Sequence, residues 1–151
     1  MDLADPSVPT ITAHIVVRDA ARAAQWYADA FGAVEERRLA VPDGRLMEVA
    51  LRIGNSPLML ADEFPELGVV SPLTVGSTYG ALHIATPDVD AAWARAVAAG
   101  AQVHQPLQDA FWGERTGQLI DPFGHRWALS QHLRDVPLEE LRAAVTAMFG
   151  G

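Results

Sequence analysis

The sequence contains no cysteine, which excludes disulfide bonds, thiolate catalysis and zinc sites built from cysteine. Basic residues are also few, since 11 of them face 19 acidic residues and leave a formal net charge of −8. A protein that binds nucleic acid neutralises phosphates with a basic face. The charge therefore argues against a nucleic-acid partner and is compatible with a cationic ligand.

Long apolar runs are missing as well. No stretch approaches the roughly 20 apolar residues that a membrane-spanning helix needs. The N-terminal sequence MDLADPSVPT is acidic and has no apolar core, so it does not resemble a signal peptide. We therefore expect a cytoplasmic protein without a membrane partner. With 151 residues, half of them hydrophobic, the chain is long enough for one domain with a substantial core.

The stretch FWGERTGQLIDPFGHRWALSQH, residues 111–132, is the one around which the rest of the chain is organised. The segment Asp121-Pro122-Phe123-Gly124 predicts a tight turn, because these residue types are favoured at the first, second and fourth turn positions. Strand-like runs on both sides predict a β-hairpin. After the turn, four residues share one face of the expected strand: Arg126, Ala128, Ser130 and His132.

The same succession of elements occurs twice. Strands are expected over residues 10–17, 34–39, 45–53 and 57–61, and again over 81–86, 101–106 and both flanks of the turn. Two helices are expected, one from Ala20 to Phe31 and one ending at Ala99. Their N-caps would be Asp19 and Asp88. Residues 62–77 hold two prolines and two glycines and are expected to form a linker or a lid.

The repeat has a constant offset. His14 and His83 lie 69 positions apart, and Glu48 and Gln118 lie 70 apart. We therefore expect an α+β fold in a single domain, with βαβββ modules over about residues 10–61 and 78–131. A C-terminal amphipathic helix is expected over residues 136–149.

Three segments carry a resemblance to a known family: VVRDAARAAQWYADAFGA, VPDGRLMEVALRIGNSPLMLAD and FWGERTGQLIDPFGHRW. They resemble the glyoxalase/bleomycin-resistance/dioxygenase superfamily, also called vicinal oxygen chelate, and in particular its PhnB-like branch. The resemblance implies two modules in a pseudo-twofold arrangement around a concave mixed-sheet pocket. It also implies a homodimer, which light scattering would test, and we expect the N-terminal arm over residues 1–9 to cross to the partner.

The enzymes of this superfamily bind a divalent metal with His and Glu or Gln, one from each ligand strand. Carried over by register, the corresponding positions here are Thr12, a position near Leu58, Ala81 and Ala128. None of these is a good ligand, because hard divalent cations need carboxylate or imidazole groups. The resemblance therefore predicts that the usual metal centre is absent and that no cofactor is bound.

Polar residues remain on the same expected faces, namely His14, Glu48, His83 and Gln118. Three interpretations stay open. These groups hydrogen-bond one another around a wet cavity, or recognise a ligand, or form a displaced metal site from His14, Glu48 and His83. Small residues leave space on the same faces, as small-molecule sites require: Ala50, Ala81, Ala85 and Ala128.

Four further residues complete the candidate ligand-binding set: Trp112, Arg115, Arg126 and Ser130. Trp112 could stack on a planar or cationic ligand or serve as a structural plug. Arg115 could instead pair with Glu114 at the rim. Two functions follow from the resemblance. One is metal-free binding of a small aromatic or cationic compound such as an antibiotic, and the other is a metal-dependent lyase, isomerase or dioxygenase.

Overall fold

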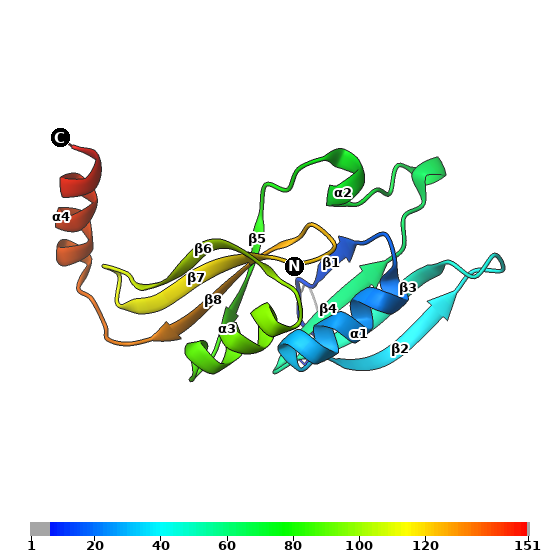
Figure 1. The fold of residues 1–151 in the computed structure, drawn as a ribbon, viewed down its shortest axis with the longest axis horizontal. Coiled ribbons are helices and arrows are strands. Elements are labelled where there is room, and N and C mark those ends of the chain that lie inside the picture. The colour runs from blue at the N-terminus through cyan, green and yellow to red at the C-terminus, as the bar shows by residue number, and fades with distance from the viewer. Residues whose placement is uncertain (1–6, 151) are drawn as a thin grey trace. The chain divides into compact units, whose positions relative to one another are not determined.

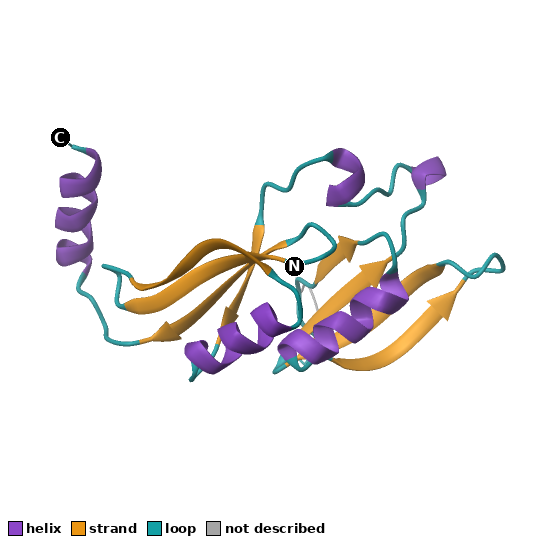
Figure 2. Ribbon diagram, in the orientation of Figure 1, coloured by secondary structure: helices purple, strands orange, loops and turns teal. Residues whose placement is uncertain are grey.

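The structure is a computed structural model that describes residues 7–150. Residues 1–6 of the expected N-terminal arm lie outside this range. The chain divides into two compact units between Thr78 and Tyr79. Each unit is built around its own four-stranded sheet (Figures 1 and 2). The expected α+β class is confirmed, whereas the pseudo-twofold arrangement of the units stays a prediction.

The first unit has the expected strand, helix and three further strands. They are β1 (Ala13–Val16), α1 (Ala20–Phe31), β2 (Val34–Ala40), β3 (Leu46–Ile53) and β4 (Ser56–Ala61). The sheet order is β1-β4-β3-β2. Strand β1 runs parallel to β4, and the other neighbouring strands are antiparallel.

Helix α1 begins and ends where its capping residues predict. The Asp19 side chain accepts a hydrogen bond from the Arg22 amide, and Gly32 adopts the left-handed conformation just after the last turn. The helix packs across β2, β3 and β4. Ala23, Trp26 and Tyr27 of this helix are buried, and the Trp26 ring meets Tyr27 edge-on with the centroids 5.5 Å apart.

The second unit repeats the plan and adds a helix. It contains β5 (Ala81–Ala85), α3 (Val89–Ala98), β6 (Gln102–Asp109), β7 (Glu114–Ile120), β8 (Arg126–His132) and α4 (Leu138–Phe149). The sheet order is β5-β8-β7-β6, with β5 parallel to β8. Helix α3 packs on β8. None of the helices in residues 7–150 has the length and hydrophobicity of a membrane span.

Each unit contains one hydrogen bond that is equivalent to a hydrogen bond in the other unit. The Ala20 amide at the start of α1 donates to Asp62 Oδ1 at 2.7 Å, and the Val89 amide at the start of α3 donates to Gln131 Oε1 at 3.0 Å. The acceptors lie 69 positions apart, from residue 62 to residue 131. This is also the offset between the two amides, so the internal duplication extends to the groups that hold each helix to its sheet.

The turn at Asp121 forms as expected. The Asp121 carboxylate is buried and accepts from the Phe123 amide at 2.8 Å, the His125 amide at 2.9 Å and the Trp127 indole at 2.8 Å. Gly124 has φ of 89°, in the region that favours glycine. One buried side chain therefore fixes both the turn and the start of β8.

Helix α4 is attached through a short segment. The Leu133 and Arg134 amides both donate to the Gly113 carbonyl, at 2.8 and 3.1 Å. No side chain of α4 is fully buried, and four large apolar residues of the helix are exposed: Leu138, Val145, Met148 and Phe149.

The connection over residues 62–77 is more ordered than the sequence predicts. It contains a 3-10 turn, η1 (Pro65–Leu67), and the short helix α2 (Pro72–Val75). Glu63 holds α2, because its carboxylate accepts from the Ser71 amide at 3.1 Å, from Thr74 Oγ1 at 2.6 Å and from the Ser71 hydroxyl. These bonds fasten the connection to the end of β4.

We expect acid to release this connection. Hydrogen bonds from Ser71 and Thr74 hold the pKa of Glu63 below its ordinary value of 4.5. A carboxylate with a lowered folded-state pKa contributes stability above its unfolded pKa and loses it as the pH falls through the folded value. Hydrogen-exchange protection factors of residues 71–76 should therefore fall as the pH drops below 4.5, the ordinary pKa, and Glu63→Gln should lower them already at pH 7. Equal protection in both proteins at both pH values would contradict this role.

Candidate functional site

In the first unit, polar residues lie on the face of the sheet opposite α1. Val49 and Leu51 of β3 are buried under the helix, so Glu48 and Ala50 point the other way. Ala50 pairs with Met59 of β4, which pairs with His14 of β1. His14, Glu48 and Ala50 therefore share the face that the sequence predicts for them.

Glu48 has a basic partner that the sequence analysis missed. Arg37 Nε on β2 lies 2.8 Å from Glu48 Oε2. The hydrogen bond from Arg37 lowers the pKa of Glu48, and the charges of Arg37 and His14 lower it further. The carboxylate is thus ionised and already neutralised. The β2–β3 hairpin register, with its turn at residues 42–44, could have placed Arg37 on this face.

The equivalent face of the second unit carries a different polar group. His83 of β5 and Gln118 of β7 both pair with Ala128 of β8. Ser130 follows on the same face and hydrogen-bonds His83 Nε2. Ser130 is only 3% exposed, so the hydrogen-bond partner of the imidazole is a buried hydroxyl group of the neighbouring strand.

Arg126 lies on this same face at the beginning of β8. It pairs with Ala81 of β5 and Ile120 of β7, one row before His83 and Ala128. Its side chain is half-buried. Hence His83, Gln118, Arg126 and Ser130, four of the predicted ligand-binding residues, share one sheet face in the second unit.

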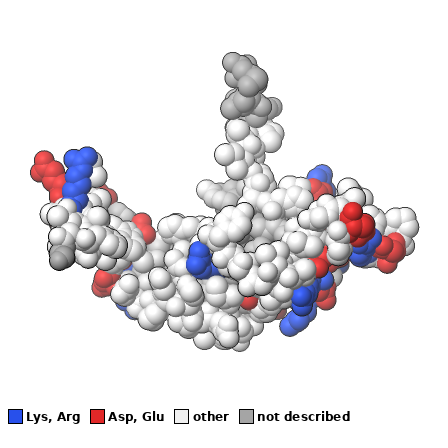
Figure 3. Space-filling model, turned by 90° about the horizontal axis from the view of Figure 1, so that it is seen from above, with Lys and Arg blue, Asp and Glu red and all other residues white. Residues whose placement is uncertain are grey.

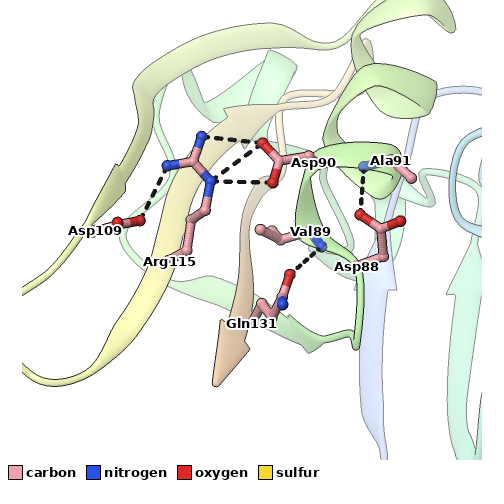
Figure 4. A network of polar contacts seen from close by, with 7 residues as sticks. All are labelled: Asp88, Val89, Asp90, Ala91, Asp109, Arg115 and Gln131. Atoms are coloured by element: carbon pink, nitrogen blue, oxygen red, sulfur yellow. Dashed lines mark hydrogen bonds and ion pairs between the residues drawn. The ribbon is translucent and has the colours of Figure 1, made fainter. Parts of the chain in front are cut away.

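Arg115 points to the opposite face, toward α3. Its guanidinium lies 3.0 Å from Asp90 Oδ1 on the helix and 3.1 Å from Asp109 Oδ1 on β6 (Figure 4). The pairing with Glu114 considered above is not formed, because successive strand residues point to opposite faces. Arg115 therefore joins the helix to the sheet, and the structure does not bring it to His83.

Trp112 lies in the loop between β6 and β7, where it is 43% exposed. The neighbouring Phe111 ring meets it edge-on with the centroids 5.0 Å apart. Trp112 is therefore no core plug within its unit. Stacking on a ligand stays a prediction.

The positions carried over from the superfamily's metal site do not fit a metal. Leu58 is buried on the α1 side, where it pairs with Ala13, so this position was assigned to the wrong face. Thr12 precedes β1, and Ala81 and Ala128 have no ligand atom on the side chain. Within residues 7–150, no three His, Asp or Glu side chains gather in a way that could hold a metal ion.

Most charged groups of the surface are paired with one another. Ion pairs join Arg38 to Glu35, Arg52 to Glu36 and Arg134 to Glu140. In the view of Figure 3, acidic and basic side chains mostly adjoin. These exposed pairs are solvated, so each adds little to stability.

Comparison with known proteins gives consistent matches. The sequence profile of the Glyoxalase/Bleomycin resistance protein/Dioxygenase superfamily matches residues 9–129. An uncharacterized protein of Mycobacterium bovis, Mb0911c, is 42% identical over 146 residues, which cover 95% of this chain and 96% of that protein.

Solved structures agree with this match. TioX from Micromonospora is similar with a TM-score of 0.64 and 28% identity, over 82% of this chain and 98% of TioX. A PhnB protein from Bacillus cereus has a TM-score of 0.62 at 16% identity, over 82% of this chain and 97% of its own, and shows the fold alone. This chain therefore belongs to the glyoxalase/bleomycin resistance protein/dioxygenase superfamily.

Proposed function

We propose that this protein binds a small organic molecule without a metal ion, in the manner of a sequestering bleomycin-resistance protein. An aromatic or cationic compound such as an antibiotic is the class that the sequence favours. Each unit offers its own candidate binding surface, the sheet face opposite α1 in the first unit and the sheet face opposite α3 in the second. Alanines at positions 50, 81, 85 and 128 leave room there, and a few polar side chains could orient a ligand.

One observation carries this proposal: two of the three groups that could form a displaced metal site already have partners. Glu48 is paired with Arg37 at 2.8 Å, and His83 is hydrogen-bonded to the buried Ser130. A metal that bound Glu48 through Oε2 would have to displace a guanidinium, and one that bound His83 through Nε2 would have to displace a hydroxyl. A site prepared for a metal instead keeps its ligand atoms free and orients them from behind.

The alternative is a metal-dependent lyase, isomerase or dioxygenase that uses His14, Glu48 and His83. A specific observation favours it, because His14 lies close enough to Glu48 for its positive charge to lower the pKa of that carboxyl. Imidazole and carboxylate together are adequate ligands for zinc or iron. The alternative therefore needs a direct test.

Calorimetry can separate the two functions. We expect no one-to-one binding of zinc, nickel, manganese or iron(II) tighter than about 1 µM, which corresponds to roughly 8 kcal/mol. We expect a panel of aromatic compounds to include ligands whose binding weakens about tenfold in Glu48→Gln or Gln118→Ala, since each loses a polar contact. Tight metal binding that disappears in both His14→Ala and His83→Ala would establish the enzyme instead.

Homodimer formation and a cytoplasmic location stay predictions, since the contacts within each unit bear on neither. The interpretation of Trp112 as a stacking residue belongs with them. Its exposure is compatible with ligand stacking, and Trp112→Ala in the same panel would test it.

A further inference from the structure

Arg126 differs from most arginines of the chain in its contacts. Six arginines form ion pairs with carboxylates at 3.1 Å or less: Arg37, Arg38, Arg45, Arg52, Arg115 and Arg134. Arg126 forms no ion pair with any carboxylate of residues 7–150, and its Nε is buried without a hydrogen-bond acceptor. Within the described residues, the guanidinium makes one long hydrogen bond, from Nη2 to the Tyr79 carbonyl at 3.4 Å.

This condition is unusual for a half-buried guanidinium. The group carries five N–H donors and stays charged at every physiological pH. Buried polar groups normally have partners, and an unpartnered one requires an explanation such as a missing ion. A planar oxyanion satisfies a guanidinium best, since it accepts two parallel hydrogen bonds.

The surroundings of Arg126 suit such a ligand. Ala81 pairs with Arg126, and Ala128 follows Arg126 on the same face, so both of these neighbours have small side chains. His83 and Ser130 lie on that face as further hydrogen-bonding groups. Glu114 lies far from Arg126, because its backbone pairs with that of His132 at the other end of β8.

The charges elsewhere do not demand a cationic ligand. Glu48 is already neutralised by Arg37. The net charge of −8 repels an anion at long range, but salt screens exposed charges over about 8 Å at physiological ionic strength. A bidentate contact at Arg126 acts at hydrogen-bond distance and is screened far less.

We infer that the ligand is an organic acid whose carboxylate is bound by Arg126, with its hydrocarbon part lying over Ala81 and Ala128. This narrows the class left open above from aromatic or cationic compounds to aromatic acids. The inference rests on the proposed binding function, and it makes Arg126 a specificity-determining residue.

The test compares three probes of one shape, naphthoate, naphthamide and naphthylmethylamine, by ligand-observed NMR and calorimetry. We expect naphthoate to bind about tenfold more tightly than the amide or the amine. Arg126→Gln should remove this preference, and Arg126→Lys should keep part of it as a point charge. Arg142→Gln is the matched control, since it removes the same charge from an exposed position on α4.

Three results would overturn the inference. Equal binding of the acid and the amide would show that no oxyanion is selected. Unchanged naphthoate binding in a folded Arg126→Gln protein, judged by tryptophan fluorescence, would place the acid elsewhere. In both cases metal-free binding itself would survive. If neither these probes nor the aromatic panel binds at millimolar concentration, the proposed function fails and the inference fails with it.

Discussion

Asp121→Ala should lower the free energy of unfolding by about 3–4 kcal/mol, a loss typical of a broken buried hydrogen-bond network. The carboxylate is 4% exposed and accepts three hydrogen bonds. The buried donors on Phe123 and Trp127 would lose this acceptor. The measurement is urea unfolding followed by circular dichroism, where the midpoint should fall while the slope stays constant.

Asp43→Ala provides the matched control for this experiment. Asp43 also lies in a turn and also accepts a backbone hydrogen bond, from Arg45 at 3.0 Å, but it is exposed to solvent. Water replaces the lost contacts there, so the midpoint should shift far less. Similar shifts in the two variants would mean that the Asp121 network does not stabilise the second unit.

Gly113→Ala should detach the segment that leads into α4. A Cβ atom at this position would lie 2.2 Å from the Arg134 carbonyl oxygen and 2.9 Å from a Val136 methyl group. The segment must move away, which breaks the two hydrogen bonds to the Gly113 carbonyl. With the strain of φ at 89°, we expect a loss of about 3 kcal/mol or more and rapid proteolysis between residues 133 and 137.

Gly44→Ala separates the clash from the backbone strain. Gly44 has φ of 93°, nearly that of Gly113, but an added Cβ would have no heavy atom within 4 Å. This control should lose only about 1 kcal/mol, the cost of placing alanine in a left-handed conformation. If α4 stays protected from protease in Gly113→Ala, the docking of residues 133–136 does not depend on this close approach.

The elements with local signals could be predicted from the sequence. Asp19 and Asp88 cap their helices as expected, because an N-cap acts on amides only two or three residues away. The turn at Asp121 follows from the same kind of local chemistry. The ends of the strands were predicted less accurately: β1 begins at Ala13 rather than at residue 10. A strand ends where its pairing with a neighbouring strand ends, and a single sequence does not contain that information.

Strand β6 was predicted to stop at Pro106 but continues to Asp109. Proline interrupts a central strand because it lacks an amide donor, but an edge strand tolerates it. The pairing with β7 steps irregularly from Gln105 to Gln108, and this irregularity accommodates Pro106. The edge position depends on the order of strands in the sheet, which the sequence pattern did not show.

Alternation along the strands correctly placed His83, Gln118 and Ser130 on one face, since the period of two is fixed by backbone geometry. The same rule, applied to Glu114, would have excluded its pairing with Arg115. Arg37 was missed because the partner of Glu48 lies across a hairpin rather than along one strand. Long-range pairs of this kind depend on register.

The edge strands β2 and β6 have a consequence for aggregation. An exposed edge offers free amides and carbonyls to another chain, and regular apolar edges can recruit strands without limit. Strand β2 carries four consecutive charged residues, 35–38, and β6 carries a proline. Both also pair irregularly with their neighbours. These features should keep either edge from extending into a fibril, even when partial unfolding exposes it at high concentration.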